Sequence, residues 1–307
     1  MDGATARDGT AGDGPLIDMR DRGVGDVVVA CWLVHAARAV GRPVRLNPRG
    51  LTDVCRMLGV EAPALSDAEG DNWAKTDGLG HRHEYALVAH GTPRPRFTAW
   101  AEALGLPGLA PVRPPYCETV AAAGWADAAW AESAEPGQLR VAMFPEVAWL
   151  IRRWPPAYFI DLADMLKAKG AAVVMVGVDK AKVGAMGCRW YAGFSLARTA
   201  ALMARADAVI GNDSGPAHLA GTLGVPTFVP CGPTDGALVF AHDPNVRCTG
   251  LPPGRLACHP CHFAVERGYR DACKVGGCRA LMTLTPEPVF DWLWPQIEGL
   301  RTAGAAD

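Results

Sequence analysis

Short apolar runs alternate with amphipathic stretches through the second half of the chain. The amphipathic stretches have the 3.6-residue periodicity of helices, and Gly170 follows the first of them as a C-cap. Because strands that are apolar throughout are buried on both faces, the pattern predicts a parallel sheet with helices on either side. The predicted strands are Leu139–Phe144, Ala171–Val178, Ala208–Gly211 and Thr227–Pro230. The predicted helices are Pro156–Lys169, Leu196–Arg205 and one that includes His218–Leu223.

The first half opens with a similar but shorter pattern. A strand at Leu16–Arg20, a glycine-rich turn and a helix over Val27–Val40 predict the start of an α/β unit. Arg45–Pro48 resembles the end of a second strand, and the signal weakens from 61 to 115. We expect a disordered arm and two α/β domains, with the bounds 1–14, 15–135 and 136–307.

Composition narrows the class of protein. Hydrophobic residues make up 50% of the chain and charged residues 20%, which excludes a disordered chain. The net charge of −2 provides no field that would attract nucleic acid. The first residues lack the basic start and apolar core of a signal peptide, and no apolar stretch reaches the length of a membrane span. A cytoplasmic protein is the expectation.

Two loops carry candidate chemistry. Gly23 and Gly25 let the backbone approach a ligand closely, and Asp26 begins the helix that follows. Asp26 can cap that helix or act as a general base at the ligand-binding edge of a parallel sheet. The second loop, after the strand at 208–211, leads into a helix N-terminus suited to a diphosphate. The polar and small residues of this second loop are Asp213, Ser214, Gly215 and His218. Thr234 belongs to the next loop.

Three segments together carry a resemblance to a known family. The run ADAVIGNDSGPAHLAGTLGVPTFVPCGPTDG at 206–236 resembles the signature of glycosyltransferase family 9, the heptosyltransferase-like group. The loop at 22–28 and the Arg-Arg-Trp-Pro sequence at 152–155 resemble two further parts of that family, in the same order along the chain. The resemblance implies a GT-B architecture, in which two Rossmann-like domains face a central cleft.

The resemblance also implies roles for single residues. Asp26 matches the base that deprotonates an acceptor hydroxyl in an inverting transfer, with no metal required at the reacting centre. Arg152 matches a lysine that contacts the donor's phosphate and sugar. Asp213, Ser214, Gly215 and His218 match diphosphate and sugar contacts, and Asp179 matches an acidic residue that binds the ribose. A solvated loop residue is the alternative for Asp179.

The donor that the resemblance implies is a nucleotide sugar, ADP-heptose first. The acceptor is a saccharide, a glycolipid, a protein or a small metabolite, and both a peripheral membrane contact and a homo-oligomer stay open. The chain departs from the family at 145–149, where hydroxyl residues are missing, and the acceptor domain is expected to be trimmed. The alternatives are a GT-B nucleotide-sugar epimerase or hydrolase, and a degenerate binding or scaffold protein.

Ten cysteines are many for this length, and the last four fall within 21 residues. Two close pairs of thiols can form a tetrahedral site for zinc or iron, although the second pair has a non-standard spacing. These four are Cys258, Cys261, Cys273 and Cys278. Reduced thiols without a metal are the alternative. The other six are expected to be small core residues.

Overall fold

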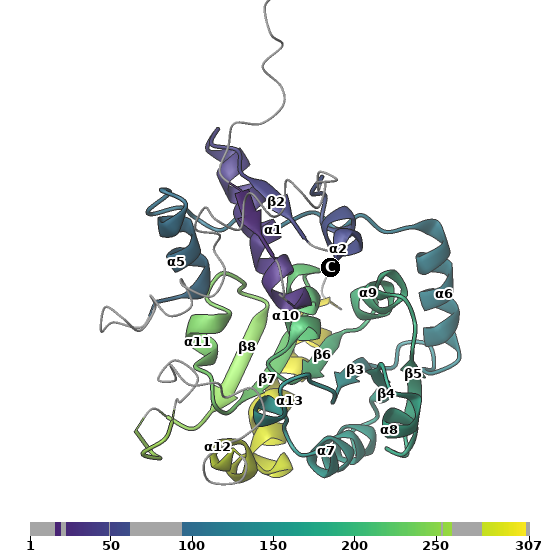
Figure 1. Cartoon of the computed structure of the whole chain (residues 1–307). Helices are drawn as coiled ribbons and strands as arrows, with labels where there is room; N and C mark the ends of the chain where they lie inside the picture. Colours follow the sequence, from purple (N-terminus) through teal and green to yellow (C-terminus); the bar gives the residue numbers. More distant parts are fainter. Residues whose placement is uncertain are drawn as a thin grey trace, which may run out of the picture.

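The carboxyl-terminal half forms a six-stranded parallel sheet. The computed structural model describes residues 16–19, 23–48, 50–61, 94–252, 254–259 and 278–304. The strand order is β5-β4-β3-β6-β7-β8, so the chain starts in the middle, runs to one edge and then returns to build the other (Figure 1). The strands are β3 Arg140–Phe144, β4 Ala172–Gly177, β5 Arg189–Ala192, β6 Ala208–Gly211, β7 Thr227–Cys231 and β8 Val246–Gly250.

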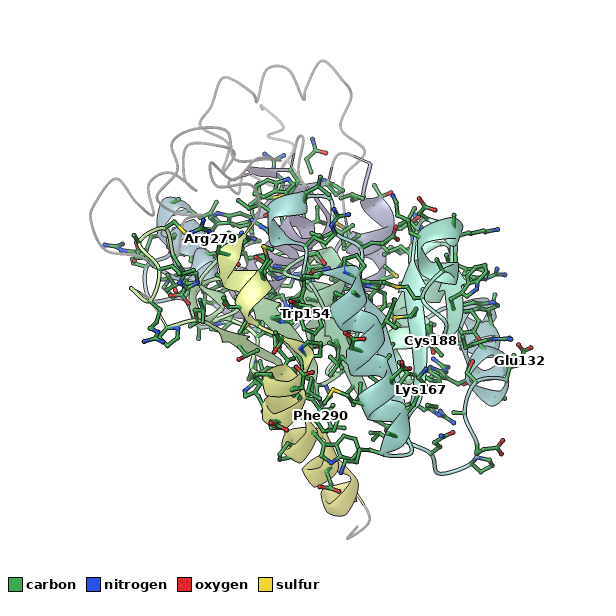
Figure 2. The ribbon with its side chains drawn as sticks, turned by 90° about the horizontal axis from the view of Figure 1, so that it is seen from below. Glu132, Trp154, Lys167, Cys188, Arg279 and Phe290 are labelled. Carbon is green, nitrogen blue, oxygen red and sulfur yellow. The ribbon has the colours of Figure 1, made fainter. Side chains whose placement is uncertain are left out.

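Side chains alternate between the two faces of this sheet. Val141 and Met143 of β3 pack with the helices of one face, and Ala142 and Phe144 pack with those of the other. Figure 2 views the first face, where α7 and α13 lie side by side beneath the sheet. The helices of this half are α7 Pro156–Ala168, α8 Lys180–Gly184, α9 Leu196–Ala204, α10 Gly215–Thr222, α11 Gly236–Val239, α12 Arg279–Thr283 and α13 Pro286–Gly304, with a 3-10 turn, η1, at Leu150–Arg152.

The amino-terminal half is smaller. Among the described residues, its sheet consists of two parallel strands. The alanine-rich stretch Val120–Ala131 is a helix that packs on α9. The elements of this half are β1 Leu16–Asp18, α1 Val24–Ala39, β2 Arg45–Asn47, α2 Thr52–Met57, α5 Arg96–Ala103 and α6 Val120–Ala131. The expected arm at 1–14 lies outside the described residues.

The two halves share one hydrophobic core. Buried residues of α1 belong to the same cluster as Phe144 of β3 and Leu219 of α10. Helix α1 packs directly against α10, as Figure 1 shows. Within the described residues, α1 is thus seated on the carboxyl-terminal half through α10. No described helix has both the length and the apolar character needed to cross a membrane.

Two glycines allow α1 and α10 to meet at their N-termini. A Cβ atom added to Gly25 would lie 2.7 Å from Cδ2 of His218 and 3.4 Å from the Cα atom of Gly215. A Cβ atom on Gly215 would lie 2.8 Å from the Cβ atom of Val24. Gly25 was predicted to let the backbone approach a ligand, and Gly215 to contact the diphosphate and sugar. In the structure their missing side chains make room for the neighbouring helix.

We expect Gly25→Ala to destabilise the protein. The added methyl group overlaps His218, and overpacking of this kind costs about 1 to 3 kcal/mol. Gly124→Ala is the matched control, because a Cβ atom there meets nothing within 4 Å and alanine favours the helix. Thermal unfolding of both variants checks this. An equal or higher Tm for Gly25→Ala would contradict the close packing of the two helices.

Candidate active site

The candidate site lies where the sheet changes direction. Strands β3 and β6 are neighbours, but the chain leaves them toward opposite edges, and ligands of such sheets bind at the carboxyl ends of these strands. Asn212 joins the two loops there. Its Nδ2 donates to the Pro145 carbonyl at 2.8 Å, and its Oδ1 accepts from the Trp154 amide at 2.7 Å. Sequence reasoning gave Asn212 no role.

Trp154 anchors the same loop from below. The side chain is fully buried, and its indole N–H donates to the Leu284 carbonyl at 2.7 Å. Figure 2 shows Trp154 on the face of the sheet that α7 and α12 cover. The loop that carries Arg152 is therefore fixed on both sides, by Asn212 above and by the α12–α13 connection below.

Arg152 and Asp213 form a buried ion pair. Nη1 of Arg152 lies 3.6 Å from Oδ2 of Asp213, and the two side chains expose 13% and 3% of their surface. The guanidinium also stacks over the Trp149 ring at 4.3 Å. Burial by itself would raise the pKa of Asp213, but the charge of Arg152, together with smaller contributions from His218, Thr234 and Arg96, outweighs burial and lowers the pKa. The pair is thus ionised and brings two sequence-predicted residues together.

His218 is a neutral member of the site. Its ring packs 4.3 Å from Phe240 and lies parallel to His242 at 6.0 Å. Burial lowers the pKa of His218 well below its usual value, and the charge of Arg96 lowers it further. The family resemblance implied that His218 contacts the diphosphate and sugar. A neutral imidazole can supply a hydrogen bond, so in the described site the positive charge near Asp213 comes from arginine.

Several buried polar atoms at this position lack hydrogen bonds to described residues. They include both carboxylate oxygens of Asp213, Nδ1 of His218 and Oγ1 of Thr234, which lies beside Asp213. Ser214 is the N-cap residue of α10, and its hydroxyl bonds to the Asn212 carbonyl at 3.1 Å. Buried polar groups in folded proteins are almost always partnered. Unsatisfied atoms gathered at a helix N-terminus therefore mark a place where a polar ligand fits.

Asp26 meets an arginine that sequence reasoning missed. Nη1 of Arg96 donates to Oδ1 of Asp26 at 3.2 Å, and the two side chains expose 7% and 18% of their surface. Asp26 lies in the first turn of α1, one residue after Gly25, which contacts His218. Asp26 therefore stands next to the Asp213–His218 group. No motif pointed to Arg96, because its partner lies 70 residues away in the sequence.

Asp179 contacts different partners. It follows β4 and caps α8, where its Oδ1 accepts from the Ala181 amide at 3.0 Å. Its pKa is lowered, first by a hydrogen bond from Lys182. The Glu146 carboxylate accepts hydrogen bonds from the amides of Val178 and Asp179, and so ties the loop after β3 to the loop after β4. Glu146 occupies the stretch where the sequence lacks the expected hydroxyl residues.

Two described residues at the ends of the cysteine segment, His259 and Cys278, both lie near Gly232. Cys278 Sγ would lie 2.9 Å from a Cβ atom on Gly232, and His259 lies near the Gly232 carbonyl. Cys258 is exposed, while Cys261 and Cys273 lie outside the described residues. The described part of the chain contains no group of three or more metal-ligating side chains. Of the other six cysteines, three are fully buried, as expected, but Cys117 is exposed.

A cavity of about 460 Å³ borders the site on its β7–β8 side. Thr234 belongs to its wall together with Asp243, Phe240, Cys248 and His259. Asp243 is 3% exposed, and burial raises its pKa to about 6. A raised pKa means that the folded protein holds this proton more tightly than the unfolded chain. Asp243 therefore reduces the stability of the fold as pH rises from about 4 to above 6.

We expect Asp243→Asn to stabilise the protein at pH 7.5 and to have little effect near pH 4. The amide keeps an acceptor for the Asn245 backbone N–H, which donates to Oδ1 at 3.0 Å. A pKa difference of about two units corresponds to about 3 kcal/mol as an upper estimate. Thermal unfolding across this pH range checks the prediction, with exposed Asp53→Asn as the control. An unchanged pH dependence of Tm would show that Asp243 does not titrate as described.

Comparison with known proteins agrees with this geometry. The sequence model of glycosyltransferase family 9 (heptosyltransferase) matches residues 115–262. Lipopolysaccharide heptosyltransferase 1 of Pseudomonas aeruginosa is 31% identical over 118 residues, which are 36% of this chain. The matched region spans only 33% of the relative's own length.

Two solved structures show the fold. ADP-heptose lipopolysaccharide heptosyltransferase II of Escherichia coli is 17% identical, with a TM-score of 0.62 over 95% of this chain and 99% of that one. The iron-containing dodecameric glycosyltransferase TibC of enterotoxigenic E. coli is 14% identical, with a TM-score of 0.65 over 93% and 76%. The fold is GT-B, as the sequence predicted. Residues 115–262 thus match glycosyltransferase family 9, and the chain as a whole has the fold of solved heptosyltransferases.

Proposed function

We propose that the protein is an inverting glycosyltransferase that moves a sugar from a nucleoside-diphosphate donor to an acceptor hydroxyl. The observation that carries this proposal is the buried Arg152–Asp213 pair at the N-terminus of α10, next to Asp26. ADP-heptose is the first candidate donor, because a TibC structure was solved with that compound and the family relatives are heptosyltransferases. A lipid A-core glycolipid, another saccharide, a protein or a small metabolite would be the acceptor.

In the proposed reaction Asp26 takes the proton of the acceptor hydroxyl. The acceptor oxygen attacks the anomeric carbon and forms the new glycosidic bond, while the bond from that carbon to the phosphate oxygen breaks. The electron pair leaves with the nucleoside diphosphate. Arg152 and the positive end of the α10 dipole at Gly215 would stabilise the charge that develops on this leaving group. The reaction needs no cofactor at the reacting centre.

The remaining residues would bind the donor. Ser214 and Gly215 at the start of α10 and neutral His218 would hydrogen-bond or adjoin the diphosphate and sugar. Asp213 would hold Arg152 in place, and Thr234 would meet the sugar where the cavity begins. Asp179 would accept from the ribose hydroxyls at the end of β4. Gly23 has open space at its Cβ position and would adjoin the substrate.

The ion pair between half-buried Asp26 and buried Arg96 favours an enzyme over a degenerate scaffold. Burying a charge pair costs free energy, and a fold without chemistry gains nothing from keeping it at this place. The test is a thermal-shift panel with ADP-heptose, other ADP-sugars and UDP- and GDP-sugars. We expect one donor class to raise the Tm in proportion to its affinity. If no nucleotide sugar raises the Tm at millimolar concentration, the proposed activity is wrong.

We also propose that Cys258, Cys261, Cys273 and Cys278 hold one structural zinc or iron ion. The convergence of Cys278 and His259 at Gly232 supports this, because the two ends of the segment meet at the end of β7. TibC is described as iron-containing, which supports the same chemistry. The ion would fasten the segment to the carboxyl-terminal domain when bound. The reaction proposed above does not involve it.

Metal analysis of protein purified without chelator tests this site. We expect about one equivalent of zinc or iron per chain, since four thiolates form one tetrahedral site. The variant Cys258→Ser with Cys278→Ser should lose the metal and lower the Tm. Cys117→Ser, an exposed cysteine on a different part of the chain, should retain both. A metal content far below one equivalent in the wild-type protein would exclude the site.

A further inference from the structure

Arg96 occupies an unfavourable position for a cation. It is the first residue of α5, where the helix dipole is positive and a cation is disfavoured. Its residue exposure is 6%, so the guanidinium has also lost most of its hydration. Local rules are broken most often where function requires it. The contacts of Arg96 indicate what that function is.

The guanidinium reaches across from α5 to the first turn of α1. There it donates to Asp26 Oδ1 at 3.2 Å, which joins two helix N-termini through one ion pair. The next residue, Phe97, is 2% exposed and its ring stacks on His242 at 6.1 Å. The packing of Phe97 therefore holds helix α5 in position independently of the ion pair. The backbone that carries Arg96 is fixed for the same reason.

We propose that Arg96 is a positioning residue for Asp26. This proposal rests on the proposed function, in which Asp26 is the base. A carboxylate at the first turn of a helix can adopt several rotamers, and only some of them point at an acceptor hydroxyl. The hydrogen bond from Arg96 fixes one oxygen and so the direction of the carboxylate. Asp26 keeps 18% of its side chain exposed, which leaves a surface that an acceptor can approach.

The same charge also serves the donor side of the site. Arg96 acts on His218, His242 and Asp213, which all lie within reach of its electric field. Arg152 stands at the other end of this group, paired with Asp213. The base and the donor site are thus each ordered by a buried arginine, one from α5 and one from η1.

The test compares Arg96→Met, Arg96→Lys and Arg94→Met. ADP release from ADP-heptose in the presence of a lipid A-core glycolipid gives kcat and both KM values. We expect Arg96→Met to lower kcat at least tenfold with KM values within twofold of wild type, and Arg96→Lys to recover part of kcat. Arg94→Met is the control: Arg94 lies two residues before α5, is exposed and pairs with Glu102. Arg94→Met should have the same kcat and KM values as the wild-type protein.

A measurement without turnover separates this proposal from the proposed function. We expect the Tm losses of Arg96→Met and Asp26→Ala to be non-additive in the double variant, since each removes the same contact. Additive losses would show that the pair is not formed. A rise in KM with unchanged kcat, or equal effects of Arg94→Met, would overturn the positioning role. Non-additive Tm losses in a protein that turns over no donor would mean that the pair is structural only and that the proposed function has failed.

Discussion

Asp26→Asn should reduce sugar transfer about 10²- to 10⁴-fold and leave donor binding intact. The amide has the shape of the carboxylate but cannot take the acceptor's proton. Donor affinity should survive because the atoms that would hold the diphosphate belong to α10 and to the loop after β3. Initial rates of ADP release and a thermal-shift titration with the donor measure the two effects separately.

The neighbouring contact supplies a control for this prediction. Asn at position 26 can still accept from Arg96, so α1 and α5 should stay together and the Tm should fall by only a few degrees. A loss of donor binding together with activity would show that the site has collapsed. A normal transfer rate in Asp26→Asn would assign the base to another residue.

Arg152→Ala should have the second large effect, on both activity and stability. The charge that faces the leaving diphosphate disappears, and the loss of one such group costs about 10²- to 10³-fold in kcat. The Asp213 carboxylate, 2% exposed, is then left without its partner, and an uncompensated buried charge costs about 3 to 5 kcal/mol. Arg152→Ala should therefore lower both kcat and the free energy of unfolding, measured by steady-state kinetics and by urea unfolding.

Two further variants separate these effects. Arg152→Ala with Asp213→Asn should regain much of the stability but none of the activity, because the double change removes the unpaired charge and leaves the leaving group unassisted. Arg152→Lys should keep part of both, since a lysine supplies charge without the planar fork. Arg153→Ala, at the exposed neighbouring position, should behave as wild type. If it lost as much activity as Arg152→Ala, the role would belong to the loop and not to Arg152.

The central sheet could be predicted because its strands are apolar throughout. Val174 and Met175 of β4 and Val209 and Ile210 of β6 are buried on both faces, and this burial leaves a continuous apolar run in the sequence. The outer strands β5 and β8 were missed. Half of β5 is exposed, and β8 is partly exposed along its length, so neither needs an apolar run. These edge strands are fixed by backbone pairing, β5 with β4 and β8 with β7. The periodicity of the sequence contains no signal of that pairing.

The sequence by itself determined the resemblance to glycosyltransferase family 9, the parallel sheet and the two loops that carry the candidate chemistry, because each depends on residues that are close in the chain. The tertiary structure decided what those residues contact. It set α1 directly on α10 through Gly25 and Gly215, and it made His218 neutral by burying it. It also brought Arg96 to Asp26 across 70 residues. Burial and long-range pairing depend on how the helices pack, and no local pattern contains that information.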